Sequence, residues 1–120
     1  MEVVGDPALA RLHPTSHHGH VEQELRTAVV LDAVGPGTSA RPAERHELER
    51  VHDPAYVAAI AALDREGWLD GDTVVGPTSY EAAALAAGCA IAAVERGAFA
   101  VVRPPGHHAL PARGMGFCVS

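Results

Sequence analysis

The stretch from residue 78 to residue 108 limits the fold more than any other part of this sequence. Residues 78–96 are rich in alanine and begin with Thr-Ser-Tyr-Glu, the pattern of a capping box, so they predict a helix that ends at Gly97. Ala98–Val102 predict a buried strand, because this run is short, apolar and β-branched at its end. A helix, a tight glycine and an apolar strand are half of a βαβ unit, so the stretch predicts an α/β fold with a parallel sheet.

The segments before this unit predict a strand and several helices that flank the sheet. Asp53 is expected to cap a helix whose first position is Pro54, because its carboxylate can accept from a free amide and proline tolerates the first turn. Gly67 should end that helix. The expected elements are a strand at Glu2–Val4, an irregular loop at Pro7–His20, helices at Val21–Val34, Pro42–Val51 and Pro54–Glu66, and a loop at Leu69–Gly76.

The length and composition are those of one globular domain. Hydrophobic residues make up 48% of the 120 residues and aromatic residues only 4%, so the core must consist mainly of alanine, valine and leucine. The net charge of −6 argues against nucleic acid as a partner, since a phosphate backbone needs a basic surface. The longest apolar run, residues 82–94, is shorter than the roughly 20 residues that span a bilayer, so no membrane partner is expected.

The cysteines and the start of the sequence bear on the cellular compartment. Cys89 and Cys118 are the only cysteines, and two cysteines without a signal peptide do not predict a disulfide framework. The first residues lack the charged and apolar regions of a secretory signal. We therefore expect a cytoplasmic protein with reduced thiols.

The pair His107-His108 is the sharpest chemical feature of the sequence. It follows the predicted strand after two prolines, which end the hydrogen-bonded ladder because neither has an amide proton. Polar residues just past the carboxyl end of a parallel strand lie where α/β sheets bind ligands. One imidazole can act as a general base near neutral pH while the other holds a charge or orients a substrate. Taken alone, such a pair is also an ordinary polar surface feature.

Four blocks of the sequence resemble the zinc-dependent histone deacetylase and acetylpolyamine amidohydrolase family. They occur in the family's order and cover most of the chain from about residue 21 to residue 118. The block with the histidine pair is the specific one. The blocks are Val51-His52-Asp53-Pro54-Ala55-Tyr56-Val57, Asp72-Thr73-Val74-Val75-Gly76-Pro77-Thr78-Ser79-Tyr80-Glu81-Ala82-Ala83, Ala100-Val101-Val102-Arg103-Pro104-Pro105-Gly106-His107-His108-Ala109 and Gly114-Met115-Gly116-Phe117-Cys118.

The resemblance implies an arginase/deacetylase-like fold and a role for each residue of the site. His108 would be the general base that takes a proton from water and passes it to the leaving amine, and His107 would stabilise charge in the transition state. Phe117 would line a narrow tunnel for the acetylated alkyl chain, and Gly116 would leave room for that chain. Arg103 is expected to be a structural anchor, through a salt bridge or a loop contact.

The resemblance also implies a reaction and a cofactor. The family uses zinc to polarise the acetyl amide carbonyl and to activate a water molecule. The expected substrate is an acetylated amine, either acetyl-lysine in a protein or an acetylated small amine. Nothing in the sequence separates these two substrates.

The sequence departs from the family pattern in one respect that affects its chemistry. The family's zinc ligands, an Asp-x-His pair and a later aspartate, follow the Gly-Phe-Cys block, and no Asp-x-His occurs in these 120 residues. We therefore expect residues 1–120 to be the N-terminal part of a single deacetylase domain, with a sheet that is incomplete on its C-terminal side, no metal ligand of its own and doubtful activity alone. His17–Arg26 matches the family's His-Pro-Glu stretch only loosely.

Three alternatives remain open from the sequence. The histidines at positions 13, 17, 18 and 20 could bind a metal, or they could lie in a solvated loop. Cys118 could be a thiol nucleophile beside the histidine pair, although no carboxylate or amide is evident to orient a base. The chain could also be a non-catalytic module that binds a partner through an open sheet edge. Such an edge would favour self-association or pairing with a missing C-terminal half.

Overall fold

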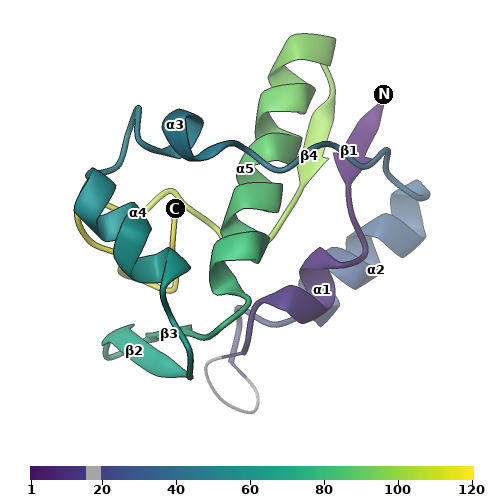
Figure 1. Cartoon of the computed structure of the whole chain (residues 1–120). Coiled ribbons are helices and arrows are strands. Elements are labelled where there is room, and N and C mark those ends of the chain that lie inside the picture. The colour runs from purple at the N-terminus through teal and green to yellow at the C-terminus, as the bar shows by residue number, and fades with distance from the viewer. Residues whose placement is uncertain (16–19) are drawn as a thin grey trace.

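A computed structural model describes residues 1–15 and 20–120. Its helices and short strands are arranged around one long helix, as Figure 1 shows. Not one of the described helices is long and apolar enough to cross a membrane. The elements are β1 (Val3–Gly5), α1 (Leu9–Leu12), α2 (Leu25–Val34), α3 (Arg45–Leu48), α4 (Pro54–Ala61), β2 (Gly67–Asp70), β3 (Thr73–Val75), α5 (Ser79–Arg96) and β4 (Phe99–Val101).

The first and last strands of the chain lie side by side and run parallel. Val4 of β1 pairs with Ala100 of β4, so the sheet joins residues that are far apart in sequence. A parallel bridge extends the sheet beyond β1 at Thr38, whose amide donates to the Val3 carbonyl at 2.9 Å and whose carbonyl accepts from Gly5 at 3.1 Å. The predicted α/β fold, with a parallel sheet and flanking helices, is confirmed.

Helix α5 is the element around which the core is built. It contacts the sheet and helices α1, α3 and α4, and Figure 1 shows it at the centre of the molecule. Its buried side chains are mostly alanine, and they take part in all three apolar clusters of the described chain. The helix ends at Gly97, whose φ of 64° is left-handed and favours glycine. The prediction of a buried helix with a glycine cap is therefore confirmed.

The start of α5 differs from the prediction of a capping box. The Thr78 side chain makes no capping hydrogen bond, and its hydroxyl donates instead to the carbonyl of Leu12 at the end of α1. A capping box occurs instead in α3, where the Glu44 amide donates to the Glu47 carboxylate at 2.7 Å and Glu44 accepts from the Glu47 amide in return. The capping pattern at Thr78 is therefore not realised, and its side chain makes a long-range contact.

The predicted loop at residues 69–76 is wrong. Strands β2 and β3 form an antiparallel hairpin there, and Gly67 begins β2 instead of ending a helix. Helix α4 ends at Ala61, although its start is as predicted, with the Asp53 carboxylate accepting from the Ala55 amide at 3.0 Å. The hairpin was missed because its strands have only three or four residues and turn-forming residues dominate the stretch between them.

The N-terminal region also contains structure that the sequence did not predict. Helix α1 lies within the expected loop, and α2 begins at Leu25, four residues later than expected. The Glu22 amide donates to Nδ1 of His20 at 3.0 Å, and the Glu22 side chain turns into the protein. This arrangement keeps residues 20–24 out of the helix.

Helix α2 and strand β4 carry several large apolar side chains that are exposed, and we call this surface the apolar face. A groove of about 350 Å³ lies between α2 and β4, with Val30 and Phe99 among its lining residues. In the described part of the chain, β4 pairs with β1 alone. The exposed large apolar residues on these two elements are Leu25, Val29, Val30, Val34 and Phe99.

Candidate active site

The histidine pair lies in a turn that follows β4. His107 and His108 are both exposed, and their ring centroids are 4.3 Å apart with the ring planes tilted by 50°. The turn comes just past the carboxyl end of a strand in the parallel sheet, which is where the sequence analysis placed it. The two imidazoles are therefore neighbours at the sheet edge that binds ligands in α/β proteins.

A second turn, formed by residues 115–118, packs against His108. It is closed by two hydrogen bonds between Met115 and Cys118, of 3.1 and 2.9 Å. Gly116 and Phe117 both have left-handed backbones, with φ of 55° and 52°. A Cβ atom on Gly116 would lie 3.3 Å from three atoms of the His108 side chain. The structure thus brings His108, Gly116 and Phe117 together.

His20 is a residue of the site that the sequence analysis missed. Its Nδ1 accepts from the Glu22 amide, so its proton is on Nε2, which lies 2.8 Å from a carboxylate oxygen of Asp72. The ring meets the edge of Phe117 at a centroid distance of 5.1 Å and an angle of 79°. The expectation of a solvated loop is wrong for His20, which is buried, while His17 and His18 lie outside the described residues.

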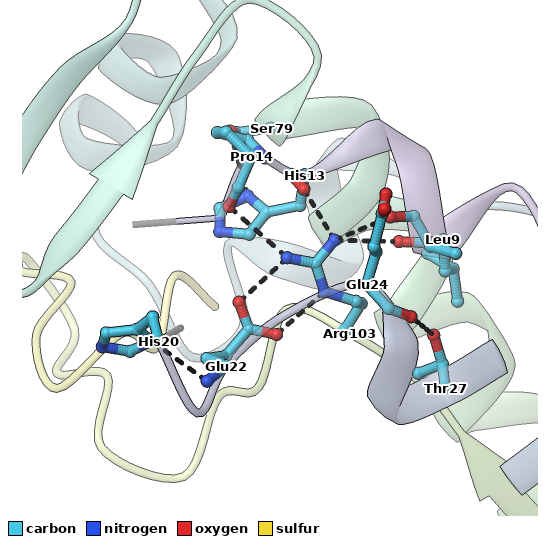
Figure 2. A network of polar contacts seen from close by, with 10 residues as sticks. Leu9, His13, Pro14, His20, Glu22, Glu24, Thr27, Ser79 and Arg103 are labelled. Atoms are coloured by element: carbon cyan, nitrogen blue, oxygen red, sulfur yellow. Dashed lines mark hydrogen bonds and ion pairs between the residues drawn. The ribbon is translucent and has the colours of Figure 1, made fainter. Parts of the chain in front are cut away.

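Arg103 holds the strand end to the N-terminal segment, as Figure 2 shows. Its guanidinium forms a two-pronged pair with Glu22, at 2.8 and 3.0 Å, and both side chains are only 2% exposed. It also donates to the carbonyls of His13 at 2.6 Å and Ala10 at 3.0 Å. The structural role expected for Arg103 is confirmed. The loosely matched stretch around Glu22 was the signal that could have located its partner.

His13 is the other buried histidine of this region. Its Nδ1 lies within hydrogen-bond distance, 3.1 Å, of Oγ of Ser79, a hydroxyl that also accepts from the Gly76 amide at 2.8 Å. The pKa of His13 is lowered to about 4, mainly by burial, because the charged ring would lose its hydration, and secondly by the nearby Arg103 guanidinium. His13 is thus held neutral in the folded protein.

This burial predicts a loss of stability in mild acid. The unfolded His13 ring takes up a proton near pH 6.5 and the folded ring only near pH 4, so the contribution is complete above pH 6.5 and falls as the pH drops toward 4. We expect the loss to reach about 3 kcal/mol. The free energy of unfolding, measured with urea at several pH values, should depend less steeply on pH over this range in His13→Gln than in the wild type. His46 is exposed, so His46→Gln should keep the wild-type dependence of stability on pH. The same dependence in His13→Gln as in the wild type would contradict the prediction.

The described residues do not by themselves fit a zinc site. No group of three histidine, cysteine, aspartate or glutamate side chains lies close enough to hold a metal ion in residues 1–15 and 20–120. His107 and His108 offer only two ligands, whereas zinc sites in proteins use three or four. The family's zinc therefore enters no step that is derived from this chain.

The thiol alternative is disfavoured by the surroundings of Cys118. The residue is fully buried beneath the histidine turn, and this burial raises the pKa of its thiol. A cysteine nucleophile must be a thiolate and must be accessible to its substrate. Cys118 therefore belongs to the wall that supports the site.

The comparison with known families covers nearly the whole chain. The histone deacetylase domain matches residues 9–120. A histone deacetylase-like amidohydrolase from Pseudomonas aeruginosa is 39% identical over an alignment 124 residues long, which covers 89% of this chain and 33% of that protein. A probable deacetylase from Methanothermobacter thermautotrophicus is 36% identical, over 87% of this chain and 35% of that protein. The chain spans about a third of the length of these curated relatives.

The fold agrees with the sequence comparison. The crystal structure of the HDA15 HD domain matches with a TM-score of 0.82 and 30% identity, over 98% of this chain and 40% of that one. The matched residues include the histidine pair and the turn that packs against it, since the family match extends to residue 120. This chain therefore belongs to the histone deacetylase family.

Proposed function

We propose that residues 1–120 form the N-terminal part of a single cytoplasmic deacetylase domain that hydrolyses acetylated amines with the help of zinc. The observation that carries the proposal is the packing of His108 against the Gly116–Phe117 turn at the end of β4. Two elements of the family's site thus meet in a chain that is 39% identical to a histone deacetylase-like amidohydrolase. Zinc supplies carbonyl polarisation in such a reaction, and its ligands must come from outside the described residues.

Each residue of the site has a chemical task in this proposal. His108 takes the proton of the attacking water and delivers it to the nitrogen of the leaving amine, so the base is regenerated in each cycle. His107, whose ring adjoins that of His108, stabilises the negative charge that develops on the carbonyl oxygen. Phe117 offers an apolar wall to the alkyl chain of the substrate. Gly116 has no side chain that would displace the His108 ring.

The substrate class follows from these surroundings. An apolar wall beside a proton-transferring pair suits an amide at the end of a flexible alkyl chain, such as acetyl-lysine or an acetylated small amine. The relatives carry names from both groups, because one is called histone deacetylase 15 and another the polyamine deacetylase HDAC10. We expect the 120-residue chain alone to be inactive.

A chimaera tests the proposal. This chain would be joined to the part of the Pseudomonas aeruginosa relative that follows its matched segment, and acetate release from an acetylated amine would be measured with zinc. His108→Ala should lower kcat by about 10²–10⁴-fold, which is the usual effect of losing a general base. His46→Ala removes an exposed imidazole elsewhere and should keep the activity. A folded, zinc-loaded chimaera that is inactive, or is indifferent to His108→Ala, would refute the proposal.

The apolar face gives a second candidate function some support. Val30 and Phe99 line the groove beside the outer edge of β4, and exposed apolar groups in such a place are typical of a binding surface. A partner, a second copy or a C-terminal half could cover this face. Under this alternative, the chimaera would fold and take up zinc but would release no acetate.

A further inference from the structure

The hairpin β2–β3 reaches the candidate active site through two of its polar side chains. A carboxylate oxygen of Asp70 accepts from the Gly116 amide at 3.1 Å, and Oγ1 of Thr73 accepts from the Phe117 amide at 2.8 Å. Asp70 and Thr73 flank the turn that joins β2 to β3. The hairpin therefore holds two consecutive amides of the turn that packs against His108.

These two hydrogen bonds act on an unusual piece of backbone. Phe117 is not a glycine, yet its φ is 52°, a conformation that bulky residues rarely adopt without support from their surroundings. Gly116, with a φ of 55°, precedes it. The surroundings must therefore keep both residues left-handed, and the hairpin supplies direct bonds to both amides.

The two hairpin side chains are themselves fixed. Thr73 is fully buried, and its hydroxyl also hydrogen-bonds the Asp70 carboxylate. The other carboxylate oxygen of Asp70 accepts from the Asp72 amide at 2.9 Å. These bonds lower the pKa of Asp70, with the Asp72 amide as the largest cause, so the carboxylate stays an acceptor at neutral pH. One carboxylate thus shapes the hairpin turn and the active-site turn together.

We propose that Asp70 and Thr73 are positioning residues of this site, which hold Gly116 and Phe117 so that His108 and the apolar wall face a bound substrate. The inference rests on the proposed function, because it assigns the two residues to the same reaction. Thr73 acts through the Phe117 amide and so sets the wall that contacts the substrate chain. Asp70 acts through the Gly116 amide, and a shift of Gly116 moves the surface on which the His108 ring lies.

The first test uses amide hydrogen exchange in the 120-residue chain. Thr73→Val removes the acceptor at nearly constant volume, and the Phe117 amide should exchange about tenfold faster or more, as expected for an amide that loses its hydrogen bond to Thr73. Thr73→Ser keeps the hydroxyl and should retain the protection. The Ala93 amide, which lies inside α5, serves as the reference for global unfolding. Unchanged Phe117 exchange in Thr73→Val, or equal losses in Thr73→Ser, would overturn the inference.

The second test uses kinetics in the chimaera. Thr73→Val should raise KM several-fold with little change in kcat, because a displaced wall weakens binding of substrate and transition state alike. In Asp70→Asn, the carbonyl oxygen still accepts from the Asp72 amide, but an NH2 group, which is a donor, now faces the Gly116 N–H. Gly116 should then shift beneath the His108 ring, so kcat should fall about tenfold. A merely structural role would leave both constants unchanged in folded protein, and that result would overturn the inference.

The two tests separate this inference from the proposed function. An inactive wild-type chimaera would refute the function, while the exchange of the Phe117 amide would still show whether Thr73 holds the turn. If Thr73→Val unfolds the chain, the Ala93 amide reveals it, and the Gly116 amide in Asp70→Asn takes over as the readout. Wild-type exchange at Gly116 in Asp70→Asn would then count against the inference.

Discussion

Arg103→Met is expected to destabilise the chain by about 3–5 kcal/mol, enough to unfold it under most conditions. The substitution preserves much of the side-chain volume but leaves the Glu22 carboxylate buried without its partner. Several carbonyls near the end of α1 lose their donor at the same time, including those of Ala10 and His13. The uncompensated charge accounts for most of the loss, because a buried carboxylate has neither water nor a cation to stabilise it.

Chemical unfolding followed by circular dichroism measures this effect, and two further variants interpret it. Arg103→Met combined with Glu22→Leu should recover a substantial part of the stability, since no charge is then buried without a partner. Arg96→Met breaks a more exposed pair with Glu2 and should cost about 1 kcal/mol or less. If the free energy of unfolding of Arg103→Met lies within about 1 kcal/mol of the wild-type value, the buried pair does not hold the N-terminal segment in place.

The Arg103 pair also explains how the site is built. It ties residues 9–14 and Glu22 to the end of β4, only a few residues before His107. His20, two residues from Glu22, then reaches the edge of Phe117. A contact between distant parts of the chain thus sets the walls of the site, while the histidine pair itself is local.

Elements with strong local signals could be predicted from the sequence. Helix α5 was expected from its alanine-rich body and Gly97, and α4 from Asp53 and Pro54 at its start, because each signal acts within a few residues. Strand β4 followed from its position after Gly97. The same is true of the histidine pair and the Gly-Phe turn, which are short motifs.

Features that depend on distant partners could not be predicted. Thr78 has the pattern of a cap, yet its hydroxyl bonds Leu12, which is 66 residues away. His20 lies in a segment whose composition predicts a loop, yet its side chain is buried beside Asp72, 52 residues further along the chain. The amides held by Asp70 and Thr73 are likewise more than 40 residues from those side chains. The spacing of apolar residues and the capping patterns of helices relate residues that are close in sequence, so they do not predict contacts between such distant pairs.

Gly88→Ala is expected to destabilise the chain by about 2–3 kcal/mol, although alanine is the better helix former. A Cβ atom on Gly88 would lie 1.9 Å from the Arg41 carbonyl oxygen and 2.9 Å from the Ala43 nitrogen, and both are backbone atoms that cannot rotate away. The Ala43 amide donates to the Ala84 carbonyl of α5 at 2.7 Å. The methyl group must therefore push residues 41–43 off the helix and stretch or break this hydrogen bond.

The reverse exchange at a neighbouring position is the matched control. Ala90 is an exposed residue of α5, and Ala90→Gly should cost about 1 kcal/mol through helix propensity alone. Propensity would make Gly88→Ala stabilising by a similar amount, so the two explanations predict opposite signs at position 88. Urea unfolding of both variants decides between them. Destabilisation by both exchanges means that residues 41–43 lie directly on α5, whereas a gain at Gly88 would mean that they do not.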